Sequence, residues 1–335
     1  MRARQTLDLM ENLRTSLSRP FVQSYLGTFL DDVKEKRGGM SYTGTTKQVG
    51  EFFAMQQRRT LEVATPYFLA ADMLPVVEYA AKGLDGLEYF THDLFPSDHG
   101  FLLFDGGHMV TDRRGKKMVD SALVWSRTVA QYDGTSYTSP GTQVTVYSDS
   151  ADPRDEVTAE IRRDGGDAYV ESLGRLQMTH VMFLADDARV GPATVSDVDI
   201  RDEYGQPVQA DNSARILMAF LLMLRQTITS TSREQVSPKQ AQRYAKKRLP
   251  SYVTVVQMRR IEGIHRAEGE SKIEWANRWL VTGHWRHQPV GPAYPGAIEE
   301  QPGEFYVRLW IAPYLKGPDG APLKPSTRKV IALTR

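Results

Sequence analysis

Apolar residues at helical spacing mark the beginning of the chain. Leu7, Met10, Leu13 and Leu17 recur every three or four residues, which predicts a helix over residues 5–35. Pro20 predicts a break in it, because proline lacks the backbone N–H that a helix interior needs. We expect further helices at 50–59 and 72–82, a loop at 38–50 and a short strand at 61–63.

From Phe101 the apolar pattern changes to a period of two, and turn residues become frequent, as is typical of a sheet. We predict a turn at Asp105-Gly106-Gly107 and a hairpin tip at 112–115. The acidic stretch 149–168 is expected to be a loop, with a short helix inside it as an open alternative. The predicted strands of this region are 101–104, 118–129, 143–148 and 180–184.

Residues 185–212 are rich in acids and chain breakers, which indicates a surface loop or linker. After it, the apolar run Ile216–Leu224 predicts a helix over 214–227 without a polar face, which must be buried. Ser237, Pro238 and Gln240 are typical of a capped helix start and predict a second helix over 238–248. Strands are expected at 253–259, 275–287, 305–312 and 328–333.

These elements predict an α+β fold with mainly antiparallel sheet. An N-terminal α/β region is followed by a helical hairpin and a C-terminal β-rich region. Because 335 residues exceed the usual size of one core, we expect two domains. The predicted division is an acidic domain at 1–195, a linker at 196–212 and a basic domain at 213–335.

The composition excludes several classes of chemistry. The chain has no cysteine, so it has no disulfide, no cysteine-ligated metal cluster and no thiol nucleophile. It lacks the P-loop, the dinucleotide-binding glycine motif and the Gly-x-Ser-x-Gly motif, so we expect no cofactor. Its first residues lack the apolar core of a signal peptide, and its longest apolar run is too short for a bilayer, which predicts a cytoplasmic protein.

Charge is distributed unevenly along the chain. Residues 1–212 hold 22 Lys and Arg against 32 Asp and Glu, a formal charge of −10, whereas residues 213–335 hold 20 against 9, a formal charge of +11. Such an asymmetry points to nucleic acid or another anionic partner. Two alternatives remain open: the two parts attract each other, or the division has no function.

The predicted helix at 238–248 carries four cations on one face, namely Lys239, Arg243, Lys246 and Lys247. Such a face suits the phosphate backbone of a nucleic acid. With the helix before it, and the strands after it as a wing, it forms a candidate helix-turn-helix. The alternative is a solvated helix face.

Tryptophan and arginine gather near the C-terminus. Aromatic rings beside guanidinium groups are typical of base stacking and phosphate contact. We predict that Trp279, Val281, Gly283, Trp285 and His287 share one face of a strand, and that some of these rings fill the core instead. The candidate nucleic-acid contacts here are Arg278, Trp285, Arg286 and Arg308.

A polar row, His284, Arg286 and Gln288, is predicted on the opposite face of that strand. With Lys316, His284 and Arg286 would make the acid–base set of a metal-independent ribonuclease. A second set of histidines and acids is a candidate divalent metal site, but it has no known ligand spacing, and acids beside glycine and proline are also normal turn formers. The residues concerned are His92, Asp93, Asp98, His99, Asp105, His108 and Asp112.

Three segments carry a resemblance: 279–288 with the sequence WLVTGHWRHQ, 308–323 with RLWIAPYLKGPDGAPL, and 330–335 with VIALTR. They resemble the C-terminal signature of an uncharacterised protein family found in actinobacteria and their phages. The resemblance extends weakly to 94–101 and to the strand around Trp125. It implies a phage or mobile-element setting and no activity.

The leading hypothesis is therefore a nucleic-acid-binding protein of phage or mobile-element origin, whose basic C-terminal region contacts DNA or RNA. One rival is a toxin-like ribonuclease. Another is a phage protein that binds a host protein. The sequence leaves the oligomeric state and any sequence preference open.

Overall fold

The structure is a computed structural model. The chain divides into two compact units, which we describe separately: Met1–Arg225 with Thr229–Met258, and Gln226–Ile228 with Arg259–Arg335. The residues that the structure describes are 2–37, 44–84, 90–111, 115–131, 138–186, 212–226, 228–259, 279–281, 283–294 and 296–316.

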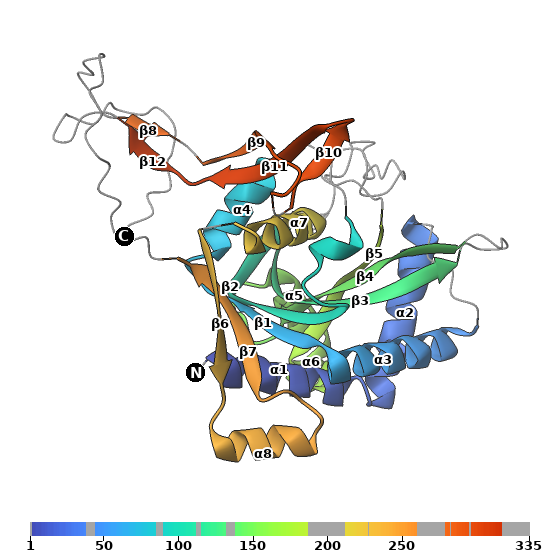
Figure 1. Ribbon diagram of the computed structural model, residues 1–335. Helices are drawn as coiled ribbons and strands as arrows, with labels where there is room; N and C mark the ends of the chain where they lie inside the picture. The colour runs from blue at the N-terminus through green and yellow to red at the C-terminus, as the bar shows by residue number, and fades with distance from the viewer. Residues whose placement is uncertain are drawn as a thin grey trace, which may run out of the picture. The chain divides into compact units, whose positions relative to one another are not determined.

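A seven-stranded sheet forms the centre of the first unit (Figure 1). Its strands follow the order β5-β4-β3-β2-β1-β7-β6. β1 is parallel to both of its neighbours, and the other pairs in this sheet are antiparallel. The bounds are β1 Thr65–Leu69, β2 His99–Thr111, β3 Lys117–Gln131, β4 Thr138–Asp149, β5 Leu176–Ala185, β6 Thr229–Gln235 and β7 Tyr252–Met258.

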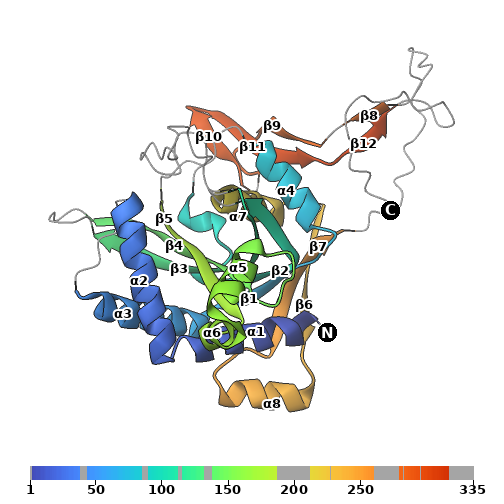
Figure 2. The ribbon, with the colours of Figure 1, turned by 180° about the vertical axis from the view of Figure 1, so that it is seen from behind.

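Helices cover both faces of this sheet (Figures 1 and 2). α1, α2 and α3 share one apolar core with strand residues such as Phe68, Phe101 and Val253, while α4 and α7 lie on the opposite face. In α7 the residues 217–221 are completely buried, which confirms the prediction of a helix without an exposed face. The bounds are α1 Arg2–Ser16, α2 Pro20–Arg37, α3 Thr46–Val63, α4 Leu74–Lys82, α5 Glu156–Gly165, α6 Asp167–Leu173, α7 Asn212–Leu224 and α8 Pro238–Lys246, with a 3₁₀ turn η1 at His92–Leu94.

The mixed helices and mainly antiparallel strands confirm the predicted α+β class. The long helix predicted over 5–35 is two helices, and the second begins at Pro20. The strand predicted at 61–63 is wrong. Those residues are the last turn of α3, because Phe53, Gln57 and Leu61 continue a buried helical stripe through them, and β1 begins only at Thr65.

One prediction about a turn is wrong, and one about a loop is only partly right. Asp105-Gly106-Gly107 is a bulge inside β2, because both glycines take positive φ values, 85° and 65°, and the strand resumes at His108. The stretch 149–168 contains α5 and the start of α6. Asp155 starts α5, since its carboxylate accepts a hydrogen bond from the backbone N–H of Thr158.

The predicted helical hairpin, and with it the helix-turn-helix, is wrong. The connector between α7 and α8 contains β6, which pairs with β7 along its whole length. α7 covers a face of the sheet, whereas α8 connects its last two strands (Figure 1). The two helices therefore do not form one DNA-reading unit.

The second unit contains short antiparallel strands. β9 (His284–Val290), β10 (Ile298–Gln301) and β11 (Glu304–Ile311) pair in the order β10-β11-β9, and β8 (Trp279–Val281) pairs with β12 (Tyr314–Lys316). The single strand predicted over 275–287 is wrong, because Gly283 separates β8 from β9. A Cβ at Gly283 would lie 2.6 Å from Cζ2 of Trp310, so the indole requires glycine there.

The observed division of the chain differs from the predicted one. β7 pairs with β1, so the segment 229–258 belongs to the first unit, and the second unit takes most of its residues from 259 onward. Nearly all of the predicted linker at 196–212 lies outside the described residues, as does the strand predicted at 328–333.

A buried carboxylate connects α5 to two strands of the first unit. Asp155 is 1% exposed and accepts hydrogen bonds from the backbone N–H groups of Thr158 at 2.7 Å and Val119 at 3.0 Å, and from the hydroxyl of Ser148. We predict that Asp155→Ala lowers the free energy of unfolding by about 2–4 kcal/mol, because a helix cap is lost and buried donors lose their acceptor.

Chemical denaturation followed by tryptophan fluorescence measures this effect. Asp164→Ala is the matched control, because Asp164 lies on the same helix with its side chain 70% exposed. The control is expected to change stability by less than about 0.5 kcal/mol. Equal losses in the two variants would contradict the assigned role of Asp155.

Candidate functional site

α8 is the basic helix that the sequence predicts. Its capping box is confirmed: the Ser237 hydroxyl accepts from the Gln240 N–H, and the Gln240 side chain accepts from the Ser237 N–H. Tyr244 anchors the inner face, since it is completely buried and its hydroxyl donates to Oδ1 of Asp8 at 2.7 Å. Burial, and then the Asp8 carboxylate, raise the pKa of Tyr244 far above its usual value, so this hydroxyl remains a donor.

The four predicted cations of α8 fall into two pairs. Nη2 of Arg243 lies 2.9 Å from Oε2 of Glu11 and 3.3 Å from Oδ1 of Asp8, and Lys247 forms an ion pair with Glu11. Lys239 and Lys246 are exposed and form no ion pair with any described residue. α1 therefore neutralises one side of α8, while two lysines, about 10 Å apart along the helix axis, remain available to a ligand.

The charge asymmetry along the chain largely disappears in the fold. The first unit holds 30 Lys and Arg against 33 Asp and Glu, a formal charge of −3, and the second unit holds 12 against 8, a formal charge of +4. The reason is that the segment 229–258, with six cations and one acid, belongs to the acidic unit. The ion pairs of α8 support attraction within the molecule. With Asp8 and Glu11 included, the formal charge of +5 of this segment falls to +3.

The candidate residues of the second unit lie on two faces of its sheet. Trp285 pairs with Trp310 and His287 with Arg308, so Trp285 and Arg308 share a face. The two indole rings pack edge to face, 5.1 Å between centroids, and Trp310 is only 5% exposed, so its ring fills the interior. Arg286 points to the opposite face, and Arg278 lies outside the described residues.

The residues of the candidate ribonuclease do not assemble in the described atoms. His284, Arg286 and Gln288 share one face of β9, as predicted, and Arg286 donates to Gln288. Lys316 is in β12, which pairs with β8, and its side chain lies outside the described residues. Ile311 is opposite His284, and Lys316 follows five residues later in the other strand pair, opposite Trp279.

The histidines and acids between residues 92 and 112 have separate partners. Nε2 of His92 is 3.2 Å from Oδ1 of Asp98, and Nδ1 of His108 is 2.7 Å from Oε1 of Glu78. The part of the chain that the structure describes contains no group of three His, Asp or Glu side chains arranged to hold a metal ion. Asp112 lies outside that part.

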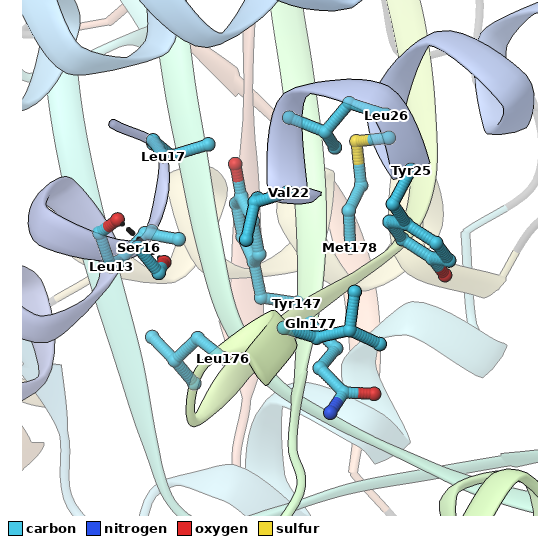
Figure 3. A pocket seen from close by; sticks show the side chains of 11 residues that line it. Leu13, Ser16, Leu17, Val22, Tyr25, Leu26, Tyr147, Leu176, Gln177 and Met178 are labelled. Atoms are coloured by element: carbon cyan, nitrogen blue, oxygen red, sulfur yellow. Dashed lines mark hydrogen bonds between the residues drawn. The ribbon is translucent and has the colours of Figure 1, made fainter. Parts of the chain in front are cut away.

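A small pocket lies in the first unit between α1, α2 and the strands β4 and β5 (Figure 3). Its lining is mainly apolar and includes Leu13, Val22, Tyr147 and Met178. Its volume of about 10 Å³ is close to the space of one water molecule, whereas small-molecule sites usually have several hundred Å³. It is a gap in the core packing rather than a substrate site.

Sequence reasoning missed two cations close to α8 in the chain. Arg233 on β6 is exposed, and its guanidinium lies 4.8 Å from the ring centroid of Tyr252. Arg248, two residues after the end of α8, is also exposed. Arg248 extends the run Lys246-Lys247, which is visible in the sequence, but Arg233 lies in a polar stretch that resembles a loop.

Comparisons with known proteins leave the function open. No family model matches the chain, and no curated protein matches it. Three chains of solved structures match, and one of them is the crystal structure of AcrVA2, with a TM-score of 0.38 and 13% identity over 93% of this chain and 94% of that chain. A similarity of this size supports no argument about function, and the resemblance to an actinobacterial and phage family stays a prediction.

The helices give one further finding. Among those in the described residues, none combines the length and the apolar content that a membrane span requires.

We predict that Tyr244→Phe lowers the free energy of unfolding by about 1.5–3 kcal/mol, the usual contribution of a hydrogen bond to a charged group. The variant keeps the ring in the core and removes only the hydroxyl that donates to Asp8. Tyr169→Phe, on the partly exposed Tyr169 of α6, is the control in the same denaturation experiment. A similar effect of both substitutions would show that the Asp8 contact does not hold α8 in place.

Proposed function

We propose that the protein binds nucleic acid through α8, with Lys239 and Lys246 contacting phosphates. The observation that carries the proposal is that these two lysines are exposed and lie on one line of the helix without an ion pair to a described residue. The segment 229–258 has a formal charge of +5, and the sum is still +3 when Asp8 and Glu11, which pair with its cations, are included. This excess adds to the attraction for a polyanion. The resemblance of the C-terminal segments adds a phage or mobile-element setting to the proposal.

The chemistry of α8 supports contact with the backbone rather than with bases. Its tyrosine is buried, and the exposed polar side chains between the two lysines are Gln242 and Arg243, of which Arg243 is already paired with Asp8 and Glu11. Lysines act on phosphates as point charges and carry little sequence information. We therefore expect nonspecific binding with a Kd of about 1–100 μM at physiological salt.

The test is fluorescence anisotropy with a labelled DNA duplex, its single strand and the corresponding RNA, each measured over a range of salt concentrations. We predict that Lys239→Glu with Lys246→Glu abolishes measurable binding at physiological salt. Replacing both lysines by glutamine is expected to reduce the slope of log K against log salt by about 2, because two phosphate contacts are lost.

Lys47→Glu with Lys82→Glu is the matched control, because both lysines are exposed, lie in the first unit and give the same change of net charge. This control is expected to bind almost as the parent protein does. If it loses binding as completely as the α8 variant, overall charge explains the interaction and the α8 site is wrong.

A gain of binding is predicted for Glu11→Gln. Glu11 pairs with both Arg243 and Lys247, so its neutral analogue releases Lys247 for a ligand and leaves Arg243 with the weaker of its two ion pairs, the one to Asp8 at 3.3 Å. We expect tighter binding and a salt slope that is steeper by about 1–2. Arg4→Gln is the control. Arg4 forms an ion pair with Asp8 on α1, and its replacement removes a positive charge instead of a negative one, so this variant is not expected to bind more tightly. Unchanged affinity in Glu11→Gln would indicate that nucleic acid does not contact α8.

A further inference from the structure

β6 is an edge strand with one open side. Its pairing with β7 has an unbroken register from Thr229 opposite Met258 to Gln235 opposite Tyr252. Just beyond the two ends of this ladder, the N–H of Arg259 donates to the carbonyl of Ile228, and the N–H of Val236 donates to the carbonyl of Ser251. In an antiparallel ladder such exchanges recur at every second residue, so the even-numbered residues of β6 bond to β7.

The odd-numbered residues Thr231, Arg233 and Gln235 therefore direct their N–H and C=O groups away from β7. The neighbouring strand supports this assignment, because the carbonyl of Val256 accepts from Ala70 on the β1 side of β7. Within the described residues no strand pairs with this side of β6. Thr229 would continue the row, but it is buried and its hydroxyl donates to the carbonyl of Met223.

The open side lacks two of the usual protections of a sheet edge, a bulge and a proline. Natural edges carry bulges, prolines or inward-pointing charges that prevent pairing with another chain. β6 has no bulge and no proline over its seven residues, whereas the β2–β3, β3–β4 and β4–β5 ladders each contain a register shift. Its one half-buried charge is Glu234. Thr231, Ser232, Arg233 and Gln235 are all exposed. The edge is therefore regular, polar and accessible.

The charge of this edge selects the chemistry of a partner. Arg233 lies over the ring of Tyr252, which holds its guanidinium beside the open backbone. Glu234, the one acid of β6, has its side chain on the opposite face and accepts a hydrogen bond from the backbone N–H of Ala3 at 3.1 Å. A segment paired with Thr231, Arg233 and Gln235 would thus meet a cation at its centre, within a stretch of chain that has a formal charge of +5.

We propose that β6 binds an extended acidic segment of a partner protein, which adds to the sheet as an eighth strand. Backbone hydrogen bonds supply affinity in this mode of recognition, and an acidic side chain opposite Arg233 supplies selectivity. A second copy of this chain fits less well, because symmetric pairing centred on Arg233 places two arginines opposite each other. The proposal is independent of the α8 lysines.

The test measures binding of a fluorescein-labelled hexapeptide of alternating glutamate and valine. A labelled hexapeptide of alternating lysine and valine is the control of opposite charge. We predict that the acidic peptide binds the full chain and that Thr231→Pro weakens binding at least about tenfold, since proline removes an outward N–H and blocks the approach of the new strand. Proline is tolerated at an edge where the N–H faces solvent, so the β6–β7 ladder is kept.

Thr231→Val is the matched control, because it keeps the outward N–H and a strand-forming side chain, and it is expected to bind as the parent protein does. Arg233→Glu changes no backbone group and is expected to reverse the preference between the two peptides. This second variant keeps the test decisive if Thr231→Pro does not fold. Hydrogen exchange should show new protection at Thr231, Arg233 and Gln235 when the acidic peptide binds.

Four outcomes would overturn the proposal: no binding of the acidic peptide, equal binding by Thr231→Pro, an unchanged peptide preference in Arg233→Glu, or self-association through β6 in analytical ultracentrifugation. Thr231→Pro is expected to leave duplex binding unchanged. If it abolishes duplex binding while Lys239→Glu with Lys246→Glu does not, then nucleic acid rather than peptide is the ligand of this edge.

Discussion

The parallel pairing of β1 with β7 joins two segments that lie far apart in the sequence. Tyr67 is opposite Thr254, and Leu69 is opposite Val256. Because β1 has β2 on its other side, its backbone hydrogen bonds are complete only when β7 is in place. The same pairing brings α8 to α1, where Tyr244 donates to Asp8, and makes β6 the last strand of the sheet. The candidate surfaces of the first unit therefore depend on this one strand contact.

Features with local causes could be predicted from the sequence. The capping box of α8, the helix start at Pro20 and the buried character of α7 each follow from neighbouring residues, and all three are present. β6 could not be predicted in this way. Its sequence TSTSREQ has no apolar face, since an edge strand with solvent around it needs none, and it is a strand because it pairs with β7. The long-range pairing with β7 makes this segment a strand, and the pattern of apolar residues along the chain does not reveal that pairing.

For the candidate site, too, local patterns predicted the positions of residues within one element but not their contacts with distant parts of the chain. Helical geometry correctly placed Lys239 and Lys246 on one line of α8. It could not show that Asp8 and Glu11, more than 230 positions earlier, neutralise Arg243 and Lys247. Likewise, strand alternation correctly grouped His284 with Arg286, but the interruption at Gly283 separates Lys316 into another strand pair. Charge counted along the chain is thus a poor guide to charge on a surface, because folding redistributes it.

The position of β7 also has a consequence for synthesis on the ribosome. β1 leaves the exit tunnel early, but its partner residues at 254–256 are added about 190 residues later. At the usual elongation rate this interval lasts roughly 10–40 s. During that time the backbone edge of β1 that pairs with β7 has no native partner. The strand that carries this edge is apolar, with Tyr67, Phe68 and Leu69. A nascent chain of this protein is thus exposed to mispairing for much longer than the time in which small domains fold.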